Sequence, residues 1–193
     1  MHPKEAYQMR TGTGRITKLT LRESEIIVGV DFTENERLNA LLKDEEYYPL
    51  MLYPGEDAKT AAELKPLDIK KKLLILVIDA TWAEAKKMVR LSTNLHTLNK
   101  ISFRSGYRSN FRIKKQPKEE CLSTIESCYY LIKELKEADV VSQDIDPQPL
   151  LSVFDKMVEQ QLECESLKHE LIGYEREHER LSLSELRALK EKS

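Results

Sequence analysis

The residues best suited to chemistry form one short stretch, Asp79-Ala80-Thr81-Trp82, directly after the apolar run of residues 73–78. A carboxylate at the end of a buried strand can act as a base, and an aromatic ring beside it can wall a binding pocket. A purely structural interpretation is also open: Asp79 or Thr81 caps the helix that follows, and Trp82 packs. From the residues alone, capping and packing are favoured over chemistry.

The elements around Asp79 decide where its side chain can act. Residues 73–78 are a continuous run of branched apolar residues, which is typical of a strand buried on both faces. After Trp82, Ala85, Met88 and Val89 recur at helical spacing, so strand and helix form half of a βαβ unit. Because ligand crevices of open α/β sheets lie at the carboxyl ends of the strands, Asp79 is expected in such a crevice.

Composition narrows the class of protein. A chain of 193 residues predicts one domain, and a net charge of −2 does not by itself indicate a polyanionic partner. Its three cysteines form no Cys-x-x-Cys pair, which argues against a disulfide framework and a zinc site and fits a reducing compartment. No stretch approaches the roughly 20 apolar residues of a membrane span, and the start lacks the apolar core of a signal peptide. We therefore predict a cytoplasmic protein that binds neither membrane nor metal.

Weaker signals organise the chain before the central strand. Residues 11–15, Thr-Gly-Thr-Gly-Arg, predict a flexible turn rather than a phosphate cradle, because the lysine pattern of a P-loop is absent. Residues 25–30 predict a strand. Thr33 and Glu36 predict a capping box at the start of a short helix.

A second candidate edge of the crevice follows that helix. Residues 49–53 predict a strand, and Pro54-Gly55 closes it with a turn. A helical turn is expected over residues 57–64, with Pro66 stopping it. Residues 101–103 predict a further short strand.

The C-terminal half is predicted to be helical. Ser123 and Glu126 form a capping box for a helix that runs to about residue 138, and the free N–H groups at its start could also receive a carboxylate or a nucleotide. Residues 150–180 predict a long amphipathic helix that Gly173 interrupts or ends. The tail, residues 175–193, alternates charges and predicts a helix that docks weakly, frays or meets a partner.

Between the two helical regions, residues 100–118 are strongly basic and contain no acid. Tyr107 and Phe111 are interleaved with the basic side chains. Cations neutralise phosphates and aromatic rings stack on bases, so this composition suits a nucleic-acid surface. A solvated basic loop, balanced by acids elsewhere, explains it equally well.

Several of these segments, in this order, resemble the DTW-domain proteins, a family of tRNA-uridine aminocarboxypropyltransferases. The family's Asp-x-Thr-Trp motif is matched by Asp79-Ala80-Thr81-Trp82. The remaining matches are Met1-His2-Pro3-Lys4-Glu5, Thr11-Gly12-Thr13-Gly14-Arg15, the Tyr-Pro loop at residues 52–58, the basic-Pro segment at 111–117, Leu122-Ser123-Thr124-Ile125-Glu126, and the helix at 154–162. The resemblance covers about residues 1–165, the expected transferase domain, and leaves residues 166–193 as a C-terminal helical tail.

The resemblance implies a fold and a reaction. The fold is α/β and SPOUT-like, with a mostly parallel sheet flanked by helices; a knotted C-terminal half is an open alternative that periodicity does not decide. The reaction transfers the 3-amino-3-carboxypropyl group of S-adenosylmethionine to N3 of a uridine in tRNA and releases methylthioadenosine. The expected partner is tRNA, and the chain is expected to be a monomer or a homodimer. Two alternatives remain: a SPOUT-type RNA methyltransferase and an RNA-binding protein without catalysis.

The resemblance also implies roles for individual residues. Asp79, Thr81 and Trp82 are the expected catalytic group, with Asp79 as the base for N3–H or as a carboxylate that orients it. The expected cofactor-binding residues are Tyr53, Pro54, Gly55, Leu122, Ser123, Thr124 and Glu126. The expected substrate-binding residues are Arg15, Arg104, Arg108, Arg112, Lys114 and Lys115. Family members commonly carry a cysteine cluster before the His-Pro-Lys-Glu segment; it is absent from this sequence, so no metal is expected.

Overall fold

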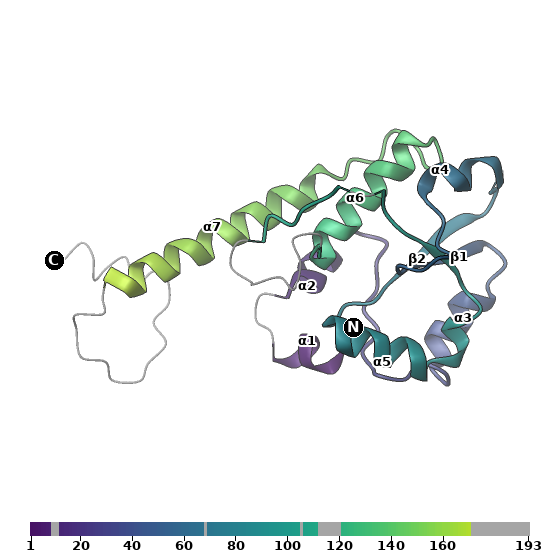
Figure 1. Cartoon of the computed structure of the whole chain (residues 1–193), viewed down its shortest axis with the longest axis horizontal. Helices are drawn as coiled ribbons and strands as arrows, with labels where there is room; N and C mark the ends of the chain where they lie inside the picture. Colours follow the sequence, from purple (N-terminus) through teal and green to yellow (C-terminus); the bar gives the residue numbers. More distant parts are fainter. Residues whose placement is uncertain (9–11, 68, 105, 112–120, 171–193) are drawn as a thin grey trace.

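A computed structural model describes residues 1–8, 12–67, 69–104, 106–111 and 121–170. Within these residues the centre is a parallel three-stranded sheet in the order β2-β1-β3 (Figure 1). Its strands are β1 (Tyr47–Leu52), β2 (Lys72–Val77) and β3 (Asn99–Ile101). In the register of the sheet, Leu50 of β1 lies opposite Ile75 on one side and Asn99 on the other. The predicted α/β class with a parallel sheet flanked by helices is confirmed, whereas the SPOUT-like topology and the knot stay predictions.

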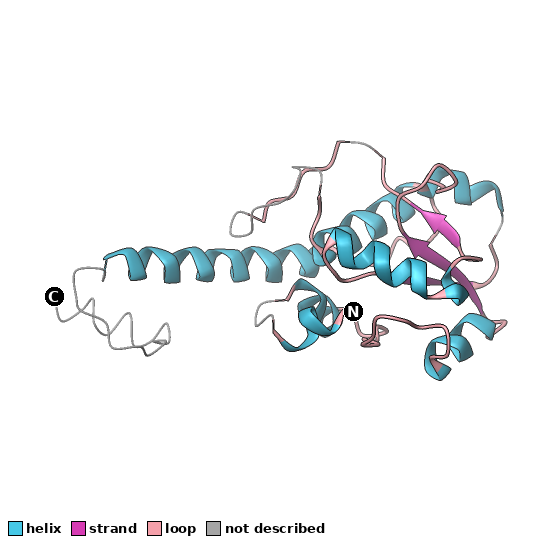
Figure 2. Ribbon diagram, turned by 60° about the horizontal axis from the view of Figure 1, so that its bottom comes forward, coloured by secondary structure: helices cyan, strands magenta, loops and turns pink. Residues whose placement is uncertain are grey.

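Helices cover both faces of β1. Neighbouring side chains of a strand point to opposite faces, so Leu50 and Met51 contact different helices. Leu50 packs with Leu64 and Leu131, from α4 (Ala61–Leu64) and α6 (Thr124–Glu137). On the opposite face, Met51 packs with Leu38 and Met88, from α3 (Glu36–Lys43) and α5 (Trp82–Leu91). The sheet is thus the middle layer between helices (Figure 2).

The apolar run 73–78 forms a strand as predicted, but its burial differs from the prediction. β2 pairs with β1 on one side only, and its residues 73–77 are half-buried. The strand buried on both faces is β1, where Leu50 and Met51 are fully buried. Continuous apolar composition therefore did not separate an edge strand from the central one. The position of Asp79, two residues beyond the end of β2, agrees with the prediction.

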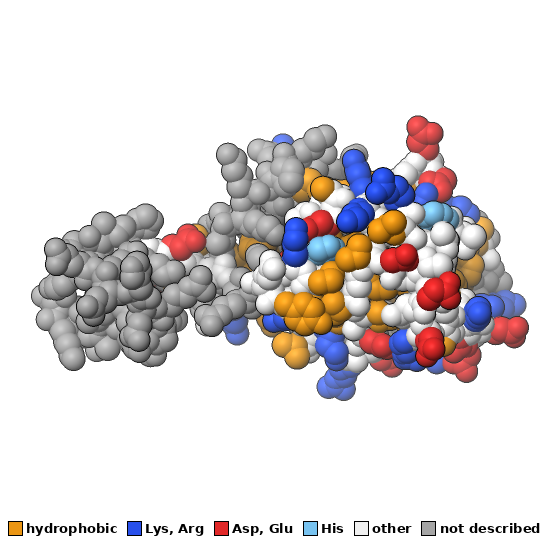
Figure 3. Space-filling view, turned by 90° about the horizontal axis from the view of Figure 1, so that it is seen from below, with side chains coloured by type: hydrophobic (Ala, Val, Ile, Leu, Met, Phe, Trp, Pro, Cys, Tyr) orange, Lys and Arg blue, Asp and Glu red, His pale blue; other side chains and the backbone are white. Residues whose placement is uncertain are grey.

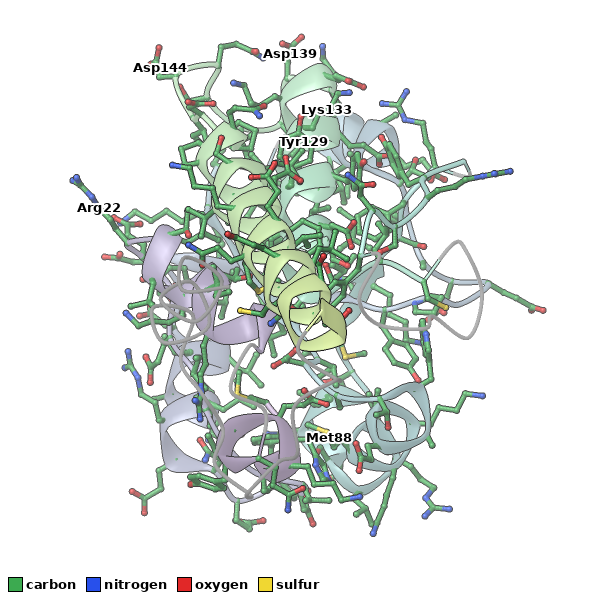
Figure 4. The ribbon with its side chains drawn as sticks, turned by 90° about the vertical axis from the view of Figure 1, so that its left-hand side faces the viewer. Arg22, Met88, Tyr129, Lys133, Asp139 and Asp144 are labelled. Carbon is green, nitrogen blue, oxygen red and sulfur yellow. The ribbon has the colours of Figure 1, made fainter. Side chains whose placement is uncertain are left out.

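A third apolar cluster joins the N-terminal and C-terminal helices. Phe154 of α7 (Gln148–Glu170) is fully buried against Ile125 of α6, and Ile16 of α2 (Thr13–Thr20) packs against the same cluster. The C-terminal part of α7 extends away from the sheet (Figure 1). In Figure 4, Met88 of α5 lies at the lower end of the view and Asp144 at the upper end, and the exposed side chains of Arg22 and Asp144 point outward.

Three predictions for the N-terminal part were wrong. Residues 12–15 are not a flexible turn: Gly12 caps α2, which begins at Thr13, after the short helix α1 (Pro3–Tyr7). Residues 25–30 form no strand, although the Gly29 amide donates to the Met1 carbonyl. Helix α3 is capped by Asn35, whose side chain accepts from the Leu38 amide.

Thr33, the predicted cap of α3, has another role. Its hydroxyl donates to Asp31 and accepts from the Thr93 amide at the start of η2 (Thr93–Leu95). These bonds connect the segment before α3 to the end of α5. Asn35, two residues later, is an equally good capping residue. The sequence pattern alone did not choose between the two.

The other predicted elements are close to their observed bounds. The short strand predicted at 101–103 is β3, which ends at Ile101. Pro66 lies inside the short helix η1 (Lys65–Leu67), which continues from α4. The long helix predicted from residue 150 is α7, and its predicted part after residue 170, including Gly173, lies outside the described residues. No helix in the described part of the chain is long and apolar enough to cross a bilayer.

Candidate functional site

A cavity of about 390 Å³ opens where the parallel strands end. Its floor comes from the segments that follow the strands: Tyr53 and Pro54 after β1, Ala80 after β2, and Ser102 and Phe103 after β3. The start of α5 and the start of α6 form its walls. The complete lining is Leu52, Tyr53, Pro54, Val77, Ile78, Ala80, Trp82, Ala85, Ser102, Phe103, Arg104, Gly106, Tyr107, Leu122, Thr124 and Ser127. A volume of this size is in the range of small-molecule pockets.

Six of the residues predicted from the sequence line this cavity together: Tyr53, Pro54, Trp82, Arg104, Leu122 and Thr124. They come from four separate segments of the chain. Trp82 is 44% exposed, and its ring lies tilted against Tyr53, with 6.4 Å between the ring centroids. Since these two aromatic rings meet at the cavity, Trp82 is not simply a core residue.

Asp79 lies at a junction behind the cavity wall rather than in the lining. Its Oδ1 accepts a hydrogen bond of 2.5 Å from the hydroxyl of Thr124, which does line the cavity. Its backbone carbonyl accepts from the His2 amide at 2.9 Å. Asp79 therefore connects the end of β2 to the start of α6 and to the N-terminal segment.

The Asp79 carboxylate lies beside the first turns of two helices, α6 and α2. Thr124 is the first residue of α6. Gly14, the second residue of α2, is so close that an added Cβ would overlap Asp79 Oδ2. The first turn of a helix has unpaired N–H groups and a partial positive charge, and Asp79 lies beside two of them. The Oδ2 atom is buried and has no hydrogen-bond partner among the described residues.

Thr81, predicted as catalytic, caps α5. Its side chain accepts from the Glu84 amide at 3.4 Å, and its hydroxyl donates to the Glu84 carboxylate at 2.9 Å. Glu84 also pairs with Lys4 of α1 at 2.7 Å. Thr81 is absent from the cavity lining, and its geometry is that of a helix cap that docks α1 onto α5.

Ser123 and Glu126 form the predicted capping box of α6, but Glu126 has a second function. This buried carboxylate accepts from the Ser123 amide and hydroxyl, and also from the Ser109 hydroxyl and the Asn110 amide. It thereby fixes one end of the basic loop to the start of α6. Neither Ser123 nor Glu126 lines the cavity.

Glu134, two turns further along α6, fixes the other end of the same loop. It is fully buried, and its Oε1 accepts from the Arg104 amide at 3.1 Å. Tyr107 stacks on Tyr130, with 4.1 Å between the ring centroids. Burial, followed by the hydrogen bond and charge of Glu134, raises the pKa of Tyr107 to about 12. The phenol is therefore protonated at neutral pH, and Glu134 holds a wall of the cavity in place.

Of the predicted substrate-binding cations within the described residues, Arg104 lines the cavity, and Arg15 and Arg108 do not. The guanidinium of Arg104 pairs with Glu137 at 2.9 Å. Arg15 and Arg108 are exposed, on α2 and in the basic loop. Arg112, Lys114 and Lys115 lie outside the described residues. Gly55, predicted to bind cofactor, is exposed beside Asp57 and does not line the cavity.

Sequence reasoning missed several lining residues, among them Phe103, Tyr107 and Ser127. Tyr107 was noted for its basic surroundings, but nothing in the sequence placed it over α6. The carboxylates that hold it, Glu126 and Glu134, are eight residues apart and thus share a side of the helix. The sequence did contain one signal for these contacts: two acidic residues in an otherwise apolar stripe of the helix, which would need hydrogen-bond donors from another segment.

Cysteine and metal chemistry receive no support from the described residues. Cys128 is buried, and burial together with the charge of Asp79 raises its pKa to about 12. A protonated, buried thiol is a poor nucleophile. No group of three or more His, Cys, Asp or Glu side chains in the described part of the chain could hold a metal ion.

Comparisons with known proteins agree with the geometry. The family model described as the DTW domain matches residues 1–162. Three similar curated proteins are each named tRNA-uridine aminocarboxypropyltransferase 2. The protein from Drosophila melanogaster is 29% identical over 96 residues, 50% of this chain and 38% of that protein. The protein from Macaca fascicularis is 25% identical over 96 residues (50% and 32%), and that from Mus musculus 23% over 118 residues (61% and 40%).

The aligned region thus spans 40% or less of the length of these relatives. No solved structure matches the chain significantly.

Gly14→Ala tests the contact between α2 and the Asp79 carboxylate. The added methyl group would overlap Oδ2 and lie 2.8 Å from Cγ of Asp79 and from Cε of Met1. We expect a loss of about 1–3 kcal/mol in the free energy of unfolding, measured by urea denaturation, as for other overpacked sites. Gly55→Ala is the matched control, because its Cβ would come too close only to the exposed Asp57 carboxylate, which can move, and would lie at ordinary contact distance from the Lys100 side chain. Equal stability of the two variants would contradict the close packing at Asp79.

Glu134→Ala tests how the cavity wall is held. Removal of the buried acceptor leaves the Arg104 amide unpaired, at a cost of about 1–3 kcal/mol. Hydrogen exchange of the amides at 103–107 should become faster. Glu137→Ala removes the exposed partner of the same arginine and should cost no more than about 1 kcal/mol. Unchanged exchange in Glu134→Ala would show that the loop is held by other contacts.

Proposed function

The chain belongs to the DTW domain family, and from this premise we propose that it is a tRNA-modifying enzyme that transfers the 3-amino-3-carboxypropyl group of S-adenosylmethionine to N3 of a uridine. Its similar relatives are named for uridine aminocarboxypropyl transfer in tRNA. The observation that carries the proposal is the buried Oδ2 of Asp79, which has no partner among the described residues and belongs to a carboxylate hydrogen-bonded to the cavity wall.

The cavity suits a donor of this kind. Its lining joins apolar and aromatic side chains such as Tyr53 and Trp82, which can pack on a nucleoside, to the start of α6, where free N–H groups suit a carboxylate. The proposed donor residues are those of the predicted set that line the cavity: Tyr53, Pro54, Leu122 and Thr124. When bound, the sulfonium of the donor supplies an activated carbon to the uridine nitrogen.

Uridine N3 carries a proton that must leave during the transfer. We assign its uptake to the pair formed by Asp79 and Thr124. The Thr124 hydroxyl gives its own hydrogen to Asp79, so its oxygen is oriented to accept a hydrogen bond from the cavity side. Asp79 then takes the proton through this hydroxyl: the Thr124 oxygen accepts the proton of N3 while its own hydrogen passes to Asp79 Oδ1. The 2.5 Å bond fixes both groups before the substrate arrives.

Trp82 occupies a position suited to the uridine base. It lines the cavity, is 44% exposed and has its ring free to stack at the opening. A base that reacts in such a pocket must first leave its stack in the RNA, and a protein ring can replace the lost stacking. Arg104, paired with Glu137, supports the opposite wall.

Identification of the released nucleoside tests the reaction type. The purified chain is incubated with unmodified tRNA and S-adenosylmethionine, and the small-molecule products are separated by liquid chromatography. The proposal predicts methylthioadenosine, formed only when tRNA is present. Release of S-adenosylhomocysteine would instead identify a methyltransferase. Binding of tRNA without either product would identify an RNA-binding protein.

Asp79→Asn tests the proton-accepting role. The amide oxygen of Asn can still accept from Thr124, so stability and tRNA affinity should stay near those of the unaltered chain, while the transfer rate falls at least ~100-fold. Asp57→Asn is the matched control: Asp57 also follows a strand at this edge of the sheet, but it is exposed and paired with Lys100. Full activity of Asp79→Asn, or its loss together with the fold, would assign Asp79 a structural role only.

A further inference from the structure

Helix α5 carries cations on its exposed side. Lys86, Lys87 and Arg90 are exposed, and none of these side chains has a partner among the described residues. Figure 3, which views the molecule from the side of α1 and α5, shows Lys and Arg side chains gathered there. Some exposed cations elsewhere are neutralised: Lys65 pairs with Asp139 and Arg37 with Glu25, each at 2.9 Å.

The acid of α5 does not neutralise this group. Glu84 is the acidic residue of the helix, and its carboxylate is occupied by Lys4 and by the Thr81 hydroxyl. The hydrogen bond from Lys4 holds the pKa of Glu84 below its usual value, so this pair stays ionised and internally balanced. Three positive charges within five residues are therefore left facing solvent.

These cations continue the side of the helix that begins at the cavity. Trp82, Lys86 and Arg90 are spaced by four residues, so they lie on one side of α5. Trp82 lines the cavity and is partly exposed. With a rise of about 1.5 Å per residue, Lys86 and Arg90 lie roughly 6 and 12 Å along the helix from Trp82. The row thus leads away from the cavity opening.

We propose that this row, Trp82 with Lys86, Lys87 and Arg90, is the docking surface for the RNA strand that carries the target uridine. The inference rests on the proposed function and adds to it the surface on which the tRNA strand binds. Every nucleotide of the strand carries one negative phosphate, so a row of cations about 12 Å long can meet more than one phosphate. The cations bind the phosphates next to the uridine, while its base enters the cavity beside Trp82.

This surface differs from the basic loop that the sequence favoured. Within the described part of that loop, Arg104 is paired with Glu137, and its backbone amide is bound to Glu134. The positive charge of Arg104 is thus already paired, within the wall of the cavity. The cations of α5 have no such acidic partner among the described residues, so they can pair with the phosphates of an RNA strand.

The test compares two pairs of charge reversals by the binding of fluorescently labelled, unmodified tRNA at several salt concentrations. Lys86→Glu with Lys87→Glu removes two charges of the row. Lys43→Glu with Lys71→Glu is the matched control, because these exposed lysines lie near the amino ends of β1 and β2, at the opposite edge of the sheet. Lys86→Gln with Lys87→Gln repeats the first change without adding acids, and the thermal midpoint of each variant shows that it is folded.

We expect the reversal in α5 to raise Kd at least ~10-fold and to lower the slope of log K against log salt by about 1.5, as the loss of two phosphate contacts predicts. The glutamine pair should show the same slope change with a smaller rise in Kd, and the control should stay within about two-fold. If the α5 variants bind like the control while the unaltered chain binds tRNA and releases methylthioadenosine, the surface is wrong and the proposed function stands. If the unaltered chain binds no tRNA, both proposals fail.

Discussion

The buried carboxylate of Asp79 is the interaction on which the site depends, because it joins three segments that are distant in sequence. Thr124 of α6 donates to it, Gly14 of α2 packs on it without space for a methyl group, and its backbone accepts from His2. Removing a carboxylate from water is costly unless it is paired. Here one hydrogen bond and the positive ends of two helices offset that cost. The same arrangement leaves one oxygen, Oδ2, buried without a partner in the described structure.

Helix α6 extends this organisation to the opposite wall of the cavity. Its first turn holds Asp79 through Thr124, and its buried acids Glu126 and Glu134 hold the two ends of the loop that carries Phe103 and Tyr107. One rigid helix therefore sets the distance between the proposed proton acceptor and the aromatic wall. The arrangement needs no residue from the C-terminal part of α7, which extends away from the sheet.

The sequence was informative where one local rule decides the outcome. The apolar run before Asp79, the predicted strand at residues 49–53 and the Ser123–Glu126 capping box each predicted an element that the structure contains. It was less informative where tertiary contacts decide. The two glycines of residues 12–15 suggested a turn, but Gly14 lies in helix α2, where the close packing against Asp79 leaves no space for a side chain. Likewise, Arg104 was predicted to meet RNA from its charge, and its pairing with Glu137 depends on a helix more than thirty residues away. The predicted role of Arg112, Lys114 and Lys115 stays a prediction.

The central claim is that the carboxylate at the end of β2 serves a transfer to a uridine ring nitrogen. The most direct measurement is mass spectrometry of the nucleosides obtained by digesting tRNA after incubation with the chain and S-adenosylmethionine. The account predicts a uridine heavier by one aminocarboxypropyl group, fragmenting with the added group on the base. A uridine heavier by one methyl group, or a nucleoside pool unchanged although the tRNA was bound, would contradict it.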